Sequence, residues 1–451
     1  MNVGQALIHH LEEHKEDYFW HHTSDLEGHI EDFFLSRRSS IDIFKAHPDI
    51  VILDCTYKTN AYKIPLLNVV GVTGNNTTIQ LAVVFLQSEN EEHFTWAMRL
   101  LRELFTSFEI PAPIAFFTDQ EAALVSVIES IFPTVPTVLC LWHVFKNVIK
   151  YAKKHGNNMA DIEVFDTNST GRRINIRRHE TPEFTEFIKT FTNCVQAPTE
   201  EVFEEWRADL HRQSSGIANY IDSQYFDLWK HKIAACYLKR ITLFGILTTS
   251  RGEGSHNTMK SWLRISKVDI YTFWSLMDKL WRQQSTEYQH MVSSATMTVA
   301  VSLQSPFWAA VNRIIFNYPL QIALKEWEHR FTNLEQQCTG VFTKSMGIPC
   351  RHQIREFISS GQVVRPHNFH PHWWIDRSIA PTLSSQIILP PRSIRDRRAE
   401  RLRSRSRPHV RGNGVHGNRR LPSAHEIPSS TINFTFINTS VSDFHTNRVP
   451  S

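Results

Sequence analysis

Residues 51–60 read VILDCTYKTN, and this stretch decides the fold of the chain. An apolar run ends there at Asp54, and a polar, cationic turn follows it. A second apolar run, residues 114–118, ends in the same way at Asp119. Buried strands that deliver a carboxylate at their exit hold a divalent metal ion rigidly. The repetition predicts two metal-binding acids at neighbouring strand ends; a capping or turn role is the alternative for either acid alone.

The order of apolar runs around these two acids predicts an α/β fold with a mixed sheet and helices on its faces. Three strand-like runs come first, a helical pattern follows them, and strand and helix then alternate twice. We expect strands at 50–53, 66–72, 79–86, 114–118 and 137–141, and helices at 93–108, at 120–132 and from 142 onwards.

The remainder of the chain divides by composition. Residues 1–48 are interpreted as an N-terminal helical segment, and residues 266–330 as a helical connector. From about 155 to 245, Phe, Trp and Tyr recur at helical spacing, which predicts an all-helical insertion. Pro, Ser, Arg and Asn dominate residues 381–451, so we expect a largely disordered tail.

The net charge of +4 conceals an asymmetry. Eleven arginines and two carboxylates between Arg392 and Arg420 give that stretch a net charge of +9, so the rest of the chain carries −5. Such a tail binds nucleic acid, carries a nuclear import signal, or is solvated without a specific partner. The positive charge is therefore concentrated in this stretch, and the body of the chain is mildly acidic.

Composition also narrows the class of protein. The six cysteines are widely scattered, which is not the pattern of a disulfide framework. No apolar run approaches the roughly 20 residues that cross a bilayer, and the N-terminus has no basic-then-apolar signal. We expect an intracellular protein without a membrane partner.

A third acid is needed if Asp54 and Asp119 belong to a two-metal site. Residues 248–260 read TTSRGEGSHNTMK and hold the best candidate. Glu253, Asn257 and Lys260 have helical spacing, so one helix face would carry a metal-binding carboxylate and a phosphate-binding ammonium. An ordinary exposed helical glutamate is the alternative interpretation.

Cys140 and His143 follow the strand expected beside Asp119. Cys-x-x-His is half of a zinc site, whereas structural zinc takes four ligands. The alternative is a buried cysteine and a packed histidine at a strand–helix junction.

Taken in order, these motifs resemble the transposase domain of Mutator-like elements (MULE), a family that the plant far-red-impaired-response proteins also resemble. The resemblance spans residues 49–265. It implies an RNase H-like fold and a DDE triad of Asp54, Asp119 and Glu253 that binds Mg²⁺ or Mn²⁺, and it associates Cys140 and His143 with the catalytic core. The motifs are DCTYKTN at 54–60, FTW at 94–96, FTDQEAA at 117–123 and CLWHVFKN at 140–147.

Residues 338–352, CTGVFTKSMGIPCRH, resemble the SWIM zinc finger that follows such transposase domains, which implies a small zinc module at 331–365. Cys338, Cys350 and His352 would bind Zn²⁺. Gly340 stands where the family has another cysteine, so either the fourth ligand comes from elsewhere or the fold persists without metal.

The resemblance implies a DDE-type transposase that cleaves DNA and transfers strands in the nucleus, as a homo-oligomer if it follows many transposases. We expect Arg172, Arg173, Arg177 and Arg178 to bind phosphate, with a solvated loop as the alternative. Related proteins often carry an N-terminal zinc-type DNA-binding domain, which we expect to be lost or truncated here because no cysteine occurs in residues 1–48. A domesticated, non-catalytic DNA-binding regulator and a non-functional genomic remnant are the other interpretations.

Overall fold

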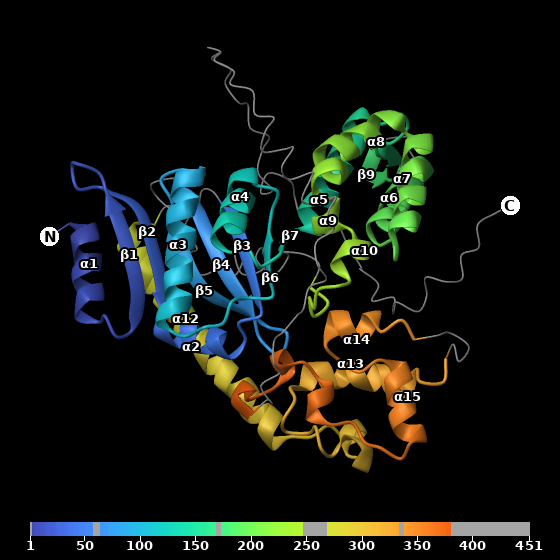
Figure 1. Cartoon of the computed structure of the whole chain (residues 1–451). Helices are drawn as coiled ribbons and strands as arrows, with labels where there is room; N and C mark the ends of the chain where they lie inside the picture. Colours follow the sequence, from blue (N-terminus) through green and yellow to red (C-terminus); the bar gives the residue numbers. More distant parts are fainter. Residues whose placement is uncertain (1, 57–63, 168–172, 247–267, 333–337, 380–451) are drawn as a thin grey trace, which may run out of the picture. The chain divides into compact units, whose positions relative to one another are not determined.

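The computed structural model describes residues 2–56, 64–167, 173–246, 268–332 and 338–379 (Figure 1). The chain divides into two units, residues 1–379 and residues 380–451, and all described residues belong to the first. The predicted disordered tail therefore lies outside the described residues.

A seven-stranded mixed sheet carries the candidate acids. Its strands are β1 (Tyr18–Ser24), β2 (Ile30–Arg37), β3 (Ile50–Thr56), β4 (Leu66–Val72), β5 (Thr78–Phe85), β6 (Ala115–Thr118) and β7 (Thr137–Leu139). The spatial order is β1-β2-β5-β4-β3-β6-β7. The pairs from β1 to β3 are antiparallel, whereas β6 and β7 continue the sheet parallel to β3. The mixed sheet confirms the α/β prediction.

The order of elements from Ile50 onwards is also the predicted one. Three strands, β3 to β5, precede α3 (Glu91–Ser107), and β6, α4 (Ala122–Ile131), β7 and α5 (Leu141–His155) then alternate. The predicted boundaries differ from these by three residues at most, and those of β4 are identical. Side-chain caps explain the start of α3, because Asn90 accepts a hydrogen bond from the backbone N–H of His93.

The prediction of a helical segment at residues 1–48 is wrong in part. Helices α1 (Val3–Glu13) and α2 (Arg38–Ala46) are present, but β1 and β2 lie between them and extend the sheet beyond β5. β2 lacks a regular alternation of apolar and polar residues. It pairs with β5, and the register aligns Phe34 with Val84, 50 residues away. A strand that depends on so distant a partner leaves no pattern in its own local sequence.

Two hydrophobic clusters cover the two faces of the sheet. Alternate side chains of β4 point in opposite directions, so Leu67 packs with α2, α3 and α4, whereas Leu66 packs with α1 and the long helix α12 (Ile270–Met297). Both leucines are fully buried. Burial on both faces explains why β3, β4 and β5 read as continuous apolar runs.

The insertion between α5 and residue 246 is mostly helical but not wholly so, which corrects the all-helical prediction. β8 (Ile162–Thr167) and β9 (Arg173–His179) form a separate antiparallel hairpin ahead of the helices. Val164 and Phe165 are residue types that favour strands. The helical spacing of the later aromatic residues led to a helical prediction for this segment as well. The helices are α6 (Pro182–Val195), α7 (Glu200–Gln213), α8 (Ser215–Ile221), α9 (Asp227–Ile233) and α10 (Ala235–Leu238), with a π-turn at Asp222–Phe226.

Short elements follow α12. The helices are α13 (Asn317–Glu328), α14 (Val341–Met346) and α15 (Arg351–Ser359), and 3₁₀ turns occur at Val301–Leu303, Pro306–Trp308, Pro366–Asn368, Pro371–Trp373 and Arg377–Ile379. Trp308 and Trp373 are almost completely buried among them. Within the described residues, no helix has both the length and the apolar character that a membrane crossing requires.

Candidate functional site: an acidic strand edge and a Cys-Cys-His cluster

Asp54 lies in β3, and Asp119 directly follows β6, the strand that runs parallel beside it. The parallel pairing of β3 with β6 aligns Ile52 with Phe117. Each acid follows its aligned residue by two positions along the chain. Neighbouring strands lie about 4.8 Å apart. The register thus brings the two predicted acids to one end of the sheet.

A buried polar row runs from Asp54 across the sheet. Asp54 is only 5% exposed, and the antiparallel register of β3 and β4 places it opposite Asn68. The Gln80 side chain on β5 donates to Asn68 Oδ1 over 2.5 Å, and the Trp281 indole N–H on α12 donates to the Gln80 carbonyl over 2.8 Å. This row was not predicted from the sequence. Its only signal is one polar residue within each of two apolar strands, Asn68 in LLNVVGV and Gln80 in TIQLAVVF.

Glu89 joins the acidic edge, and it too was not predicted from the sequence. It lies in the connection between β5 and α3, where nothing in its neighbours distinguishes it from a surface glutamate. Burial raises its pKa to about 7; a hydrogen bond from the Cys55 thiol opposes the rise, and the charge of Asp119 adds to it. Three side chains from three segments, Cys55, Glu89 and Asp119, therefore interact at one place.

The pKa values of two other acids at this edge, Asp119 and Glu121, are also raised. Burial raises the pKa of Asp119, and the charge of His143 is the largest opposing influence. Burial also raises the pKa of Glu121, with further contributions from Asp119 and Glu89. Buried carboxylates that repel one another favour protonation or a counter-cation. The edge is thus a concentration of negative charge at the exit of β6.

His143 and Cys140 have different roles in the structure. Cys140 caps the N-terminus of α5, is 1% exposed, and donates its backbone N–H to the Thr118 carbonyl over 2.8 Å. His143 lies one turn further along α5 and interacts electrostatically with Asp119. Neither residue belongs to a group of three metal-ligating side chains in the described ranges. The geometry ties the pair to the acidic edge through Asp119.

Several predicted site residues lie outside the described residues. These are Glu253, Asn257, Lys260 and Arg172. The backbones of Arg173, Arg177 and Arg178 lie in β9, opposite Thr167, Val164 and Glu163 on β8.

Two contacts join the helical insertion to the sheet near Asp119. The Gln120 side chain, next to that acid, donates to the carbonyl of Gln224 over 2.5 Å. Lys232 on α9 is buried and forms an ion pair with Glu129 on α4. The insertion is therefore attached beside the acidic edge.

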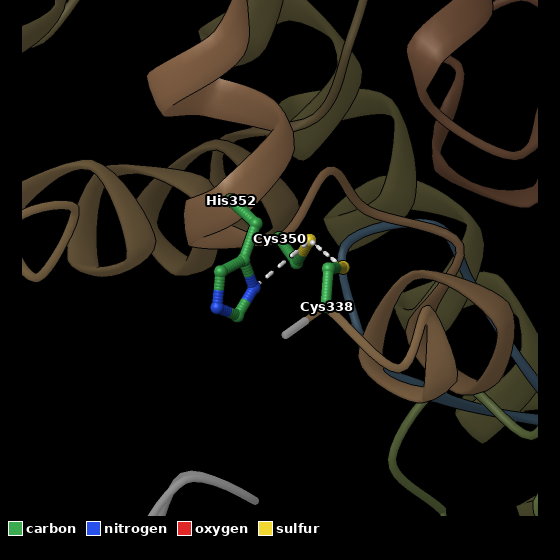
Figure 2. Close-up of side chains that lie close together, drawn as sticks. All are labelled: Cys338, Cys350 and His352. Atoms are coloured by element: carbon green, nitrogen blue, oxygen red, sulfur yellow. Dashed lines mark hydrogen bonds between the residues drawn. The ribbon is translucent and has the colours of Figure 1, made fainter. Parts of the chain in front are cut away.

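Cys338, Cys350 and His352 come together as the second candidate site (Figure 2). The Cys338 and Cys350 sulfurs are 3.7 Å apart, and the Cys350 sulfur is 3.9 Å from His352 Nδ1. All three donor atoms lie within 4.8 Å of one another. Cys350 caps α15 and is buried, whereas Cys338 is exposed. The arrangement brings together the three ligands that the sequence predicts.

A buried ion pair supports this cluster from behind. Arg351, between Cys350 and His352, donates its backbone N–H to Glu326 Oε2 over 2.9 Å, and its guanidinium lies 3.3 Å from the same oxygen. Both side chains are less than a tenth exposed. Glu326 on α13 thereby holds the Cys350–His352 turn in one orientation.

Comparison with known families identifies part of the chain. Residues 50–147 match the MULE transposase domain. This segment begins at the first residue of β3 and ends within α5, so it contains Asp54, Asp119 and the Cys140–His143 pair.

Three curated relatives show lower, wider similarity. The chain is 25% identical to Protein FAR1-RELATED SEQUENCE 5 and 24% identical to Protein FAR-RED IMPAIRED RESPONSE 1 of Arabidopsis thaliana, over 61% and 60% of its own length. It is 23% identical to the PKS-NRPS hybrid synthetase cheA of Chaetomium globosum over 84% of its length. These matches cover 32%, 30% and 8% of the respective relatives, so the chain spans about a third of their length or less.

Proposed function

Residues 50–147 match the MULE transposase domain. On this basis we propose that the chain is a DDE-type transposase that cleaves DNA and transfers the cut strand. The family domain supports DNA as the partner, and the mixed sheet with its strand order supports an RNase H-like fold. The register of β3 and β6, which brings Asp54 beside Asp119, carries the proposal. Action on DNA implies a nuclear location in a eukaryotic cell.

The donors at the acidic edge fit Mg²⁺ or Mn²⁺. Asp54, Asp119 and Glu89 offer carboxylate oxygens, the ligands that these hard cations prefer. Burial raises the pKa of Asp119 and of Glu89, so the edge gains from a divalent counter-cation. When bound, the ions activate water or a 3′-hydroxyl and stabilise the leaving oxygen in phosphodiester cleavage.

The side chains of this chain have distinct roles in the proposal. Asp54 and Asp119 hold the cations from the sheet, and Glu253 supplies the third carboxylate. His143 offsets the charge of Asp119 from α5 and keeps that carboxylate oriented. Lys260 meets a phosphate of the DNA, three positions from Asn257.

Binding to DNA is proposed to rest on phosphate contacts, since cleavage is the same reaction at any base. Arg172, Arg173, Arg177 and Arg178 on and before β9 provide one basic strip. The arginines between 392 and 420 provide another.

The Cys338, Cys350 and His352 cluster is proposed to hold Zn²⁺ structurally. Two thiolates and one imidazole within 4.8 Å of one another form a zinc-type donor set, and His352 is kept neutral because burial lowers its pKa. The proposed function of this zinc is to stabilise the turn between α14 and α15.

The decisive experiment is a cleavage assay with Asp119→Asn. The substrate is DNA that carries the terminal repeats flanking the coding region, with Mg²⁺ or Mn²⁺. We expect cleavage by the wild-type protein, retained cleavage by Asp42→Asn at an exposed position on α2, and none by Asp119→Asn. Unchanged far-ultraviolet circular dichroism shows that the fold persists. Cleavage by Asp119→Asn at the wild-type rate would refute the triad.

A non-catalytic DNA-binding regulator is the second candidate, favoured by the similarity to the FAR-RED IMPAIRED RESPONSE 1 protein. It predicts that wild type and Asp119→Asn bind the same DNA equally and that neither cleaves it. The same assay, run beside a filter-binding measurement, separates the two functions.

A further inference from the structure

The first helix carries a group of potential metal ligands that the transposase proposal does not use. His10 and Glu13 on α1, and His14 at its C-terminal cap, have donor atoms within 4.8 Å of one another. Their spacing of three and four residues places them on one helix face. The two imidazole rings are stacked, with centroids 4.2 Å apart and an angle of 21° between their planes. This geometry allows both rings to present a nitrogen to one ion.

A backbone contact assigns the tautomer of His14. Its Nδ1 lies 3.0 Å from the carbonyl oxygen of His10, and that oxygen can only accept a hydrogen. Nδ1 is therefore the protonated nitrogen, and Nε2 keeps its lone pair directed away from the backbone. A histidine that donates one N–H to a carbonyl while the other nitrogen binds a metal is the usual arrangement of protein metal sites.

An aromatic contact holds the His10 ring in place. Its ring lies against the indole of Trp274 on α12, with centroids 4.4 Å apart. This contact positions the His10 imidazole beside α12, at the last turn of α1.

The charges around the three residues suit a cation. The C-terminal end of α1 is the negative end of its helix dipole, and the three residues lie there. Glu13 also lies 3.3 Å from His9 Nδ1, an exposed interaction that a stronger ligand bond would replace. His9 stands next to His10 in sequence but belongs to no group of three ligands in the described part of the chain.

We propose that His10, Glu13 and His14 form a binding site for a divalent transition-metal ion of the Zn²⁺ class. Two imidazole nitrogens and one carboxylate oxygen are the ligand types that such ions select over Mg²⁺ or Ca²⁺. Bound metal links the last turn of α1, and through the His10–Trp274 contact it strengthens the packing of α1 on α12. The site is independent of the acidic edge and of the Cys338 cluster.

The test measures Zn²⁺ binding by isothermal titration calorimetry on the full chain with Cys338→Ser and Cys350→Ser, which removes the thiolate site. We expect about one equivalent of Zn²⁺ to bind, and His14→Gln to weaken that binding about tenfold or more. The matched control His9→Gln should retain the affinity. His14 is exposed, so its replacement leaves the fold intact, which circular dichroism verifies.

Thermal unfolding supplies the second measurement. Zn²⁺ should raise the Tm of the double serine variant and leave the Tm of the same protein with His14→Gln unchanged, because only a native-state site shifts the equilibrium. Equal Zn²⁺ affinity in the His9→Gln and His14→Gln proteins would overturn the proposal. So would the absence of Zn²⁺ binding in the double serine variant.

Discussion

His372 Nδ1 lies 3.0 Å from Oδ2 of Asp49, although 323 residues separate the two in sequence. Arg377 also binds Asp49, with distances of 2.6 and 3.1 Å to its two carboxylate oxygens. Asp49 immediately precedes β3, the strand that carries Asp54. The segment after the Cys-Cys-His cluster is thereby fastened to the start of the candidate catalytic strand.

Asp49→Asn should destabilise the protein. His372 is fully buried and the carboxylate is 3% exposed, so the change leaves a buried polar partner and a cation without their counter-charge. Loss of one partner of a buried pair costs about 3–5 kcal/mol. Urea denaturation measures the change. Asp42→Asn, in the exposed pair with Arg38, should cost less than about 1 kcal/mol. Equal midpoints for the two variants would contradict a stabilising role for the Asp49 contacts.

His47 should make the protein less stable in mild acid. Burial lowers its pKa from 6.5 to about 3, so an unfolded chain binds a proton that the folded chain refuses. Stability is therefore full above pH 6.5 and falls as the pH decreases towards 3. His370, whose pKa burial lowers to about 4, contributes with the same sign.

The urea midpoint at several pH values measures this effect. Between pH 6.5 and the ordinary aspartate value of 3.8, Asp49 adds nothing to the slope, because its lowered pKa matters only below 3.8. His47→Gln should flatten the dependence in that window. A slope identical to that of the wild type would show that His47 charges as readily in the folded state as in the unfolded one.

Glu89→Gln should stabilise the metal-free protein at alkaline pH. Burial raises the pKa of Glu89 from 4.5 to about 7, so the folded chain keeps a proton that the unfolded chain loses, and stability falls as the pH rises through this range. The amide removes that loss. The same change should diminish the rise in Tm that Mg²⁺ or Mn²⁺ produces, since it deletes a carboxylate ligand. Glu103→Gln, exposed on α3, is the matched control and should change neither quantity.

Glu326→Gln should weaken the affinity of the Cys338 cluster for zinc. Glu326 orients Arg351 between two of the ligands, and loss of such a supporting contact lowers metal affinity by about 10–100-fold. Competition with a chromogenic chelator measures it. Glu328→Gln, two residues further along α13 and exposed, should bind zinc as the wild type does. Equal affinity in both variants would show that the ligands are held without the ion pair.

Arg177→Gln with Arg178→Gln should reduce the salt dependence of DNA binding. Each phosphate contact contributes about 0.9 to the slope of log K against log salt, so losing two contacts lowers the slope by about 1.8. Fluorescence anisotropy over a salt series measures the slope. Arg212→Gln, exposed on α7, serves as the control. An unchanged slope in the double variant would assign these arginines to the solvated-loop alternative.

The correctly predicted part of the fold was readable from local sequence patterns. Asp54 and Asp119 each end an apolar run, and their strands alternate with helices at readable spacing, so their approach followed from short stretches of sequence. β1 and β2 were missed because β2 pairs with β5, about 50 residues away, and β1 pairs in turn with β2. The β8–β9 hairpin was missed because the aromatic helical pattern after it dominated the interpretation.

The residues of the candidate sites also divide into those that a local motif predicts and those that it does not. Cys338, Cys350 and His352 were readable because motif spacing survives in sequence, and their approach in space agrees with it. Glu89, Asn68 and Gln80 were not readable, since each acquires its environment from segments distant in the chain.

The sequence by itself determined the mixed α/β order from Ile50 onwards and the two acids at the ends of its strands. Hydrophobic periodicity and the polar residues that end a strand are features of a few neighbouring residues, so they can be read locally. Only the tertiary structure decided which side chains surround those acids and that His372 fastens the start of their strand through Asp49. Burial and electrostatic contact depend on groups that the fold brings together, and no local pattern encodes them.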